Sequence, residues 1–285
     1  MGELLKGKPV ADAITLEVKN GVEELNAKNI HPKLMIVRVG ERQDDLSYEK
    51  SAIKRMQNCG IECEVTALPV DISQDDFIDK LKAVNDDTSV HGILLFRPLP
   101  KQIDENVVKH IINPTKDIDC FNPANVAKTV EGDKTGFAPC TPTAAMEILK
   151  YNNIELKGKR AAVIGRSLVV GKPMAMLLLG ENATVTICHS RTSELAKVAS
   201  EADILVAAIG KSKMITEDFV KEGAVVIDVG INVDEEGNLS GDVDTDKCKE
   251  KASFITPVPA GVGSVTTAVL AKHVLKACCL SNNIL

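Results

Sequence analysis

The stretch AAVIGRSLVVGKP, residues 161–173, has the residue types of a phosphate-binding turn. Gly165 ends an apolar, β-branched segment, and Gly171 opens a segment with helical periodicity. A phosphate can bind the exposed backbone N–H groups at such a helix start, which makes both glycines candidate cofactor contacts, together with Arg166 and Ser167. The spacing is not GxGxxG, so a glycine turn that merely joins a strand to a helix remains the alternative.

The end of the next apolar segment, CHSRT at residues 188–192, lies where a dinucleotide-binding fold contacts the adenosine ribose. A site selective for NAD would usually place Asp or Glu there, whereas this sequence has His189, Ser190 and Arg191. Arg166 is in the preceding turn. Because cationic donors suit a 2′-phosphate, the predicted cofactor is NADP rather than NAD. An ordinary solvated charge is the alternative for Arg191.

Two later turns, AAIGK at residues 207–211 and IDVGIN at residues 227–232, also place glycines after apolar segments. The backbone can approach a ligand closely at such positions. Gly210, Gly230 and Ile231 therefore join the candidate cofactor contacts.

The stretch HGILLFRPLP, residues 91–100, does not end in a glycine turn like the segments above. The run finishes with Phe96 and Arg97, and prolines then interrupt it. These residues form either a simple turn or the rim of a site.

The elements that must position these residues alternate along the chain. β-branched or apolar segments that end near Gly, Pro or a polar residue read as strands, and the stretches between them have helical periodicity. Such alternation predicts parallel sheets in an α/β fold. The predicted strands are residues 33–39, 61–68, 91–96, 160–165, 183–188, 203–210 and 224–230.

The spacing of the last four strands is typical of a doubly wound nucleotide-binding sheet, whereas the first three follow a long opening helix. We therefore divide the chain into a first domain of residues 1–143 and a second, Rossmann-like domain of residues 144–266. The last helical stretch, about residues 267–285, has no strand after it and is expected to pack on the first domain.

Composition excludes several classes of function. The net charge of −6, the absence of Trp and the presence of only two Tyr argue against nucleic-acid binding. No apolar run reaches the roughly 18 residues of a membrane span, and the N-terminus lacks a secretory apolar core. Eight cysteines without a CxxC pair, and five scattered histidines, predict reduced thiols and no metal site. We expect a cytoplasmic protein.

Five motifs occur along the chain in the order KDIDCFNP, PCTPT, GRSLVVGKP, CHSRT and TPVPAGVG. They resemble the methylenetetrahydrofolate dehydrogenase/cyclohydrolase family along almost the entire chain. The resemblance implies an N-terminal catalytic domain, a C-terminal NADP-binding Rossmann domain, a folate cleft between them, and a homodimer.

The resemblance also assigns substrate contacts. Tyr48 matches the tyrosine that lies along the folate, and Asp119 matches the aspartate that binds the pterin. A carboxylate can accept two hydrogen bonds from an amino-pyrimidine edge, which gives the second match a physical basis. Without the resemblance, Tyr48 would read as a core aromatic and Asp119 as a turn cap.

In TPVPAGVGSVTT, the residues Pro259, Gly263 and Thr266 match family positions around the nicotinamide and the folate. Ala260, Ser264 and Val265 replace the usual Gly, Pro and Met there, while Cys120 stands where the family usually has glycine. These changes bear on loop shape more than on binding.

The family has a lysine four residues after the tyrosine and a glutamine in the motif HGILVQLPLP. Ala52 and Phe96 stand at these positions, so FRPLP, with Phe96 and Pro98, is interpreted as an altered rim of the folate site. Ser51 is the neighbour closest in helical register to Tyr48, and it carries no amine. Arg97 reaches the glutamine's side only if the chain turns at Pro98.

Hydride transfer needs aligned carbon atoms in a dry cleft, whereas hydrolysis of the methenyl product needs an oriented, deprotonated water. The prediction is therefore an NADP-dependent 5,10-methylenetetrahydrofolate dehydrogenase whose cyclohydrolase activity is lost or very weak. One alternative is a bifunctional enzyme in which Arg97, Arg55 or a mobile lysine replaces the missing groups. Others are a catalytically silent dinucleotide-binding module and a dehydrogenase for a different small acid.

Overall fold

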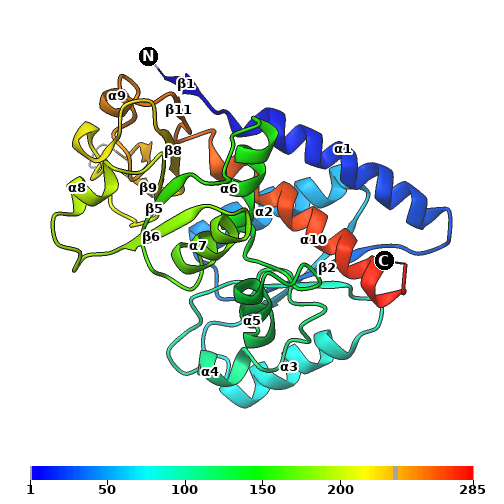
Figure 1. Ribbon diagram of the computed structural model, residues 1–285. Helices are drawn as coiled ribbons and strands as arrows, with labels where there is room; N and C mark the ends of the chain where they lie inside the picture. The colour runs from blue at the N-terminus through cyan, green and yellow to red at the C-terminus, as the bar shows by residue number, and fades with distance from the viewer. Residues whose placement is uncertain (1, 234–236, 285) are drawn as a thin grey trace. The chain divides into compact units, whose positions relative to one another are not determined.

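The computed structural model of the 285-residue chain describes residues 2–233 and 237–284. The chain divides into two compact units, each of which combines helices with a parallel sheet (Figure 1). Unit 1 comprises Met1–Ala11 and Pro139–Thr266, and unit 2 comprises Asp12–Ala138 and Thr267–Leu285. The predicted two-domain α/β fold is confirmed.

Unit 1 contains a six-stranded sheet with the order β1-β11-β8-β7-β5-β6, in which every neighbouring pair is parallel. The residues of β7 and β8 are all buried, and those of β5 are buried after the first. Continuous apolar runs of this kind suit a sheet covered on both faces. The strands are β1 (Glu3–Leu4), β5 (Arg160–Ile164), β6 (Thr184–Cys188), β7 (Ile204–Ala207), β8 (Val225–Asp228) and β11 (Phe254–Ile255).

In unit 1, α7 follows β5 and α8 follows β6, as in a doubly wound sheet, and α7 packs against β6 and α6. A short antiparallel pair, β9 (Asn232–Val233) and β10 (Leu239–Ser240), follows β8. The helices are α6 (Cys140–Tyr151), α7 (Gly171–Gly180), α8 (Leu195–Ala199) and α9 (Thr245–Cys248), with 3-10 turns at η1 (Glu217–Phe219) and η2 (Val262–Ser264).

Unit 2 has a parallel three-stranded sheet with the order β3-β2-β4. Its core gathers residues of β2 and β4 around the buried Phe77 and Leu81 of α3. The strands are β2 (Lys33–Val39), β3 (Glu62–Leu68) and β4 (Gly92–Leu95), and the helices are α2 (Gln43–Cys59), α3 (Gln74–Asp86), α4 (Glu105–Val108) and α5 (Pro123–Glu131). Helix α1 (Gly7–Asn26) begins within unit 1, and α10 (Thr266–Ser281) begins at Thr266, the last residue of unit 1.

The units differ from the predicted domains in two places. Met1–Ala11 belongs to unit 1, because β1 adds a strand beside β11 through the register Glu3 with Phe254 and Leu4 with Ile255. The boundary at Pro139 precedes the predicted one, since α6 packs against α7 of unit 1. Residues 267–285 group with unit 2.

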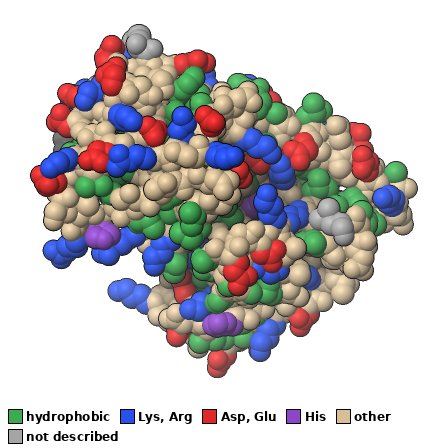
Figure 2. All heavy atoms as spheres, viewed as in Figure 1, with side chains coloured by type: hydrophobic (Ala, Val, Ile, Leu, Met, Phe, Trp, Pro, Cys, Tyr) green, Lys and Arg blue, Asp and Glu red, His purple; other side chains and the backbone are tan. Residues whose placement is uncertain are grey.

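Acidic and basic side chains are interspersed over the face of the molecule shown in Figure 2. Among the described residues, no helix combines the length and the apolar character that crossing a membrane requires.

Candidate functional site

The carboxyl ends of four neighbouring strands in unit 1 hold most of the predicted cofactor contacts. Gly165 follows β5, the segment from His189 to Arg191 follows β6, Gly210 follows β7, and Gly230 follows β8. These strands are parallel neighbours, so their ends lie along one edge of the sheet. Ligands bind at this edge in open α/β sheets. The structure thus places together residues that are separate in sequence.

The turn between β5 and α7 is tight enough to require its glycines. Gly165 has a φ of +135°, and a Cβ added there would overlap the carbonyl oxygen of Ala208. A Cβ at Gly171 would overlap the carbonyl oxygen of Gly165. The hydroxyl of Ser167 accepts the Val170 N–H at 3.1 Å and so organises the start of α7. Chain packing alone therefore accounts for both glycines, while residues 166–169 remain exposed on the turn.

The turn after β6 is fixed by its own hydrogen bonds. The His189 N–H donates to Thr192 Oγ1 at 2.9 Å, and the Arg191 N–H donates to His189 Nδ1 at 3.2 Å. Ser190 and Arg191 are exposed at this strand end. The side chain of His189 is therefore used within the turn, and the residues beside it present a hydroxyl and a guanidinium.

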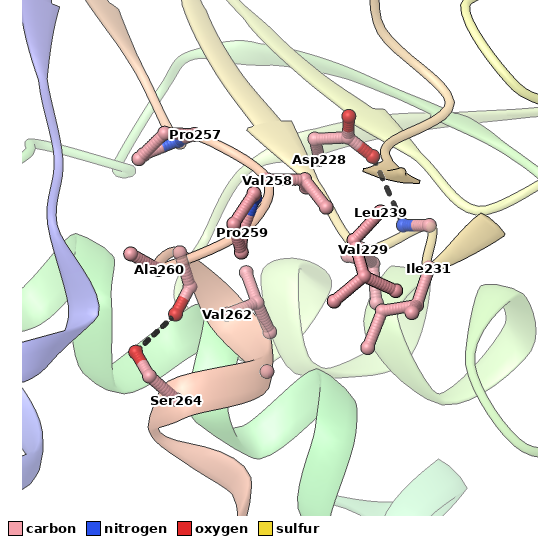
Figure 3. A pocket seen from close by; sticks show the side chains of 13 residues that line it. Asp228, Val229, Ile231, Leu239, Pro257, Val258, Pro259, Ala260, Val262 and Ser264 are labelled. Atoms are coloured by element: carbon pink, nitrogen blue, oxygen red, sulfur yellow. Dashed lines mark hydrogen bonds between the residues drawn. The ribbon is translucent and has the colours of Figure 1, made fainter. Parts of the chain in front are cut away.

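A cavity of about 220 Å³ in unit 1 joins the end of β8 to the segment before α10. It is lined by Gly230 and Ile231 together with Pro259 and Gly263. The motif IDVGIN predicts the first two as cofactor contacts, and the separate motif TPVPAGVGSVTT predicts the last two as contacts around the nicotinamide and the folate. Its apolar side chains come from two segments, and Figure 3 shows Val229, Ile231 and Leu239 on one side with Val258, Pro259 and Val262 on the other. Thr266 is buried, and its hydroxyl donates to the Gly263 carbonyl at 3.0 Å, so its side chain supports this segment.

Two buried carboxylates in unit 1 were not predicted. Asp228 is 1% exposed and Asp242 is 0% exposed. Burial raises the pKa of Asp228 to about 7, although hydrogen bonds from the backbone of Val243, Asp242 and Gly230 oppose the shift. An aspartate inside the apolar run VVIDVG was the available signal, because a buried carboxylate requires several donors.

In unit 2 the structure brings Tyr48 and Phe96 together. Tyr48 lies on α2 and Phe96 directly follows β4, and their ring centroids are 5.9 Å apart in an edge-on arrangement. Phe96 is only 8% exposed. The family glutamine position is therefore filled by a ring that packs on the predicted folate tyrosine.

Arg97 lies over the ring of Phe121, with its guanidinium carbon 4.3 Å from the ring centroid. Phe121 follows the segment that carries Asp119, so the chain does turn after β4 and brings Arg97 beside that segment. Pro98 is exposed at the turn. Phe96 thus contacts the predicted folate tyrosine, and Arg97 contacts a residue two positions after Asp119.

The segment that carries Asp119 is held by a third buried carboxylate, Asp117. Asp117 accepts the N–H groups of Phe121 and Asn122 at 2.9 and 2.8 Å and the Asn125 amide at 2.9 Å. Burial raises its pKa, and these donors oppose the shift. The segment closes through Cys120, which has a left-handed φ of +59° at the family's glycine position.

A buried histidine of α10 also supports this segment. His273 Nδ1 is 2.8 Å from the carbonyl oxygen of Ile118, and burial lowers the pKa of His273 to about 4. Its ring packs edge-on against Phe137. The neutral imidazole therefore ties α10 to the segment that precedes Asp119.

The residues around Ala52, at the family's lysine position, have partners of their own. Ala52 is completely buried, and Ser51 is exposed with its hydroxyl donating to the Ser47 carbonyl at 3.0 Å. Arg55 donates to the hydroxyls of Thr15 and Thr267 at 2.6 and 3.3 Å. Arg55 is thus bound to α1 and α10, whereas Arg97 lies on the ring of Phe121.

Comparison with known proteins matches both parts of the chain. Residues 5–119 match the family described as "Tetrahydrofolate dehydrogenase/cyclohydrolase, catalytic domain". Residues 139–282 match "Tetrahydrofolate dehydrogenase/cyclohydrolase, NAD(P)-binding domain".

Individual relatives agree over the full length. The bifunctional protein FolD of Clostridioides difficile is 64% identical over 282 residues, which cover 99% of this chain and 98% of that protein. A bifunctional FolD of Campylobacter jejuni has a solved structure with a TM-score of 0.96, at 40% identity and full coverage of both chains. A Trypanosoma brucei FolD structure, complexed with NADP cofactor and inhibitor, has a TM-score of 0.93 at 34% identity, with 99% of this chain and 98% of that chain covered. The chain therefore belongs to the tetrahydrofolate dehydrogenase/cyclohydrolase family, with its catalytic domain and its NAD(P)-binding domain.

Proposed function

We propose that this protein is a bifunctional enzyme, an NADP-dependent 5,10-methylenetetrahydrofolate dehydrogenase that also hydrolyses the 5,10-methenyl product. The observation that carries the proposal is 64% identity over 99% of the chain to a relative named a bifunctional FolD protein. The sequence-based prediction that the cyclohydrolase is lost finds no support in such relatives.

The residues of unit 1 fit a dinucleotide phosphate. The exposed turn after Gly165 offers backbone N–H groups, and Arg191 offers a guanidinium at the strand end where the ribose 2′-phosphate would lie. When bound, NADP supplies the hydride acceptor. The chain's own contribution is to bind and orient the dinucleotide through these groups and through the apolar cavity that Pro259 and Ile231 line.

The residues of unit 2 fit the folate. In this proposal the Asp119 carboxylate accepts two hydrogen bonds from the amino-pyrimidine edge, and the Tyr48 ring lies along the substrate. Phe96 packs against Tyr48 and so fixes the tyrosine ring and excludes water from its edge. Arg97, which lies over the ring of Phe121, supplies a cation beside the segment that carries Asp119. An arginine does not act as a base, but it can orient a water and stabilise the hydroxide that forms when this water passes a proton to solvent.

A specific observation favours a second candidate, a monofunctional dehydrogenase. Ala52 is completely buried and Phe96 is 8% exposed, and neither side chain can accept a proton or hold a water. Under this candidate the enzyme releases the methenyl compound, and a separate cyclohydrolase consumes it.

One experiment tests both candidates. Purified protein is mixed with 5,10-methylenetetrahydrofolate and NADP, and the reduced cofactor and the methenyl chromophore are followed separately in a buffer where methenyl hydrolyses slowly. Reduced cofactor with faster methenyl consumption than in the blank supports the bifunctional enzyme, and equal accumulation of both supports the monofunctional one. No reduced cofactor would contradict both and favour a silent dinucleotide-binding module.

The family resemblance also supports a homodimer as the state in solution. Sedimentation equilibrium would test this part of the proposal, and a mass equal to that of a single chain at micromolar concentration would contradict it.

A further inference from the structure

The ends of β7 and β8 are held by buried carboxylates that the proposed chemistry does not use. Asp242 follows the β9–β10 pair and is 0% exposed. Its Oδ2 accepts the N–H groups of Ile209 and Gly210, the latter at 3.0 Å, and its Oδ1 accepts the Lys211 N–H at 2.8 Å. One carboxylate thus binds three successive backbone amides directly after β7.

The same carboxylate also reaches the segment after β8. The Asn232 side-chain amide donates to Asp242 Oδ1 at 2.9 Å. Gly230 lies so close that a Cβ there would overlap the Asp242 carboxylate. The two strand ends that carry Gly210 and Gly230 are therefore fixed relative to each other by one side chain.

Asp228 holds Asp242 in turn. Its Oδ1 accepts the N–H groups of Gly230 at 2.9 Å and Asp242 at 3.1 Å, and its Oδ2 accepts the Val243 N–H at 2.9 Å (the Gly230 bond is drawn in Figure 3). A Cβ at Gly241 would overlap the Asp228 carboxylate. The Asp242 carboxylate thus packs against Gly230, close to Asp228 in sequence, and the Asp228 carboxylate packs against Gly241, which precedes Asp242.

This arrangement decides which groups remain for a ligand. The amides of residues 209–211 point to Asp242, so they are not available to bind a phosphate. At Gly210, which has a φ of +71°, a Cβ would meet no atom within 4 Å, so the outer side of this loop is open. Ile231 is 64% exposed on the neighbouring segment and lines the cavity.

We propose that Asp242 is a positioning residue for the dinucleotide: held by Asp228, it fixes the loops after β7 and β8 in the shape that receives the cofactor. The proposal rests on the proposed function in that NADP occupies this edge of unit 1. Asp242 acts through residues 209–211 and 230–232 and does not itself contact the cofactor.

The test compares two variants of buried aspartates. In Asp242→Asn, both positions of the side-chain amide face N–H donors, so either rotamer directs an NH2 group at a donor. The matched control is Asp117→Asn, which makes the same change at a buried carboxylate that accepts backbone amides in unit 2. Titration calorimetry with NADP alone gives the affinity, and steady-state kinetics give KM for each substrate.

For Asp242→Asn we expect the Kd for NADP to rise roughly 10- to 100-fold, with KM for the folate changed less than about twofold. Asp117→Asn should show the reverse, because Asp117 supports the segment of Asp119. Hydrogen exchange of the amides at residues 209–211 should accelerate only in Asp242→Asn.

Wild-type affinity for NADP in Asp242→Asn, or equal losses for both substrates in both variants, would overturn the inference. If wild-type protein itself fails to bind NADP, the proposed function is overturned instead, and the inference with it. Should Asp242→Asn not fold, Asn232→Ala removes a single donor to Asp242 and is expected to weaken NADP binding roughly 3- to 10-fold. An unchanged Kd in that variant would contradict the proposal.

Discussion

Replacing Arg191 by alanine should reduce the preference for NADP over NAD. The turn that carries Arg191 is fixed by the bonds of His189 to Thr192 and of Arg191 to His189, so truncation leaves its backbone in place. Charge-assisted hydrogen bonds contribute about 1.5–3 kcal/mol, and exposure to solvent reduces the upper value. One such pair to the 2′-phosphate is therefore worth roughly a 10- to 100-fold change in kcat/KM for NADP.

NAD has a hydroxyl where NADP has this phosphate, so kcat/KM for NAD should change less than about twofold. The assay measures initial rates of cofactor reduction with each dinucleotide at low and moderate salt, since screening should shrink the effect of Arg191. Lys197→Ala removes a charge from an exposed ion pair with Glu194 on the same unit and serves as the control. An equal loss for NADP and NAD in Arg191→Ala would refute the assignment of Arg191 to the 2′-phosphate.

Three further changes test other parts of the structure. The double variant Ala52→Lys, Phe96→Gln should raise the ratio of cyclohydrolase to dehydrogenase rates by roughly tenfold or more, because it restores the family's polar pair; a folded variant with an unchanged ratio would contradict our account of the site. Gly171→Ala should lower the free energy of unfolding by about 1–3 kcal/mol, because the new Cβ would overlap the Gly165 carbonyl. Gly210→Ala should lower it by about 1 kcal/mol, because Gly210 has a left-handed φ but open space around it; guanidinium unfolding would measure both. The pKa of His273 is lowered to about 4, so its neutral form stabilises the fold above the unfolded pKa near 6.5 and this contribution falls as the pH drops toward 4. The difference in the free energy of unfolding between wild type and His273→Gln should therefore shrink by about 2–3 kcal/mol from pH 7 to pH 4.5. The titration of Asp228 cancels in this difference because both proteins retain Asp228. A difference that does not change with pH would count against a buried neutral histidine.

Local patterns in the sequence were sufficient to predict the type of fold. The apolar runs that became β5, β7 and β8 are separated by helical stretches, and this alternation alone predicts a parallel α/β sheet. The glycine turns after these strands led to the prediction of a dinucleotide site at one edge of the sheet, because strand ends of a parallel sheet share one edge. The family followed from long motifs, and matches along both domains confirm it.

Contacts between distant segments decided the rest. Residues 3–4 joined unit 1 because they pair with Phe254 and Ile255 of β11, at the far end of that unit's sequence. The position of the Arg97 side chain depended on a turn after β4 and on its contact with Phe121. Strand periodicity predicts neither the turn nor the contact. Asp242 lies in a polar stretch with no motif of its own, and its role appears only when the ends of β7 and β8 are adjacent in space.

The sequence by itself therefore determined the longer strands, β2 to β8, and which strand ends carry glycine, since these depend on neighbours within a few residues. It did not predict the two-residue strands β1, β9, β10 and β11. Only the tertiary structure decided which polar groups are buried together, because a carboxylate such as Asp228 is stabilised by donors from residues 230, 242 and 243 that meet it only in the folded chain.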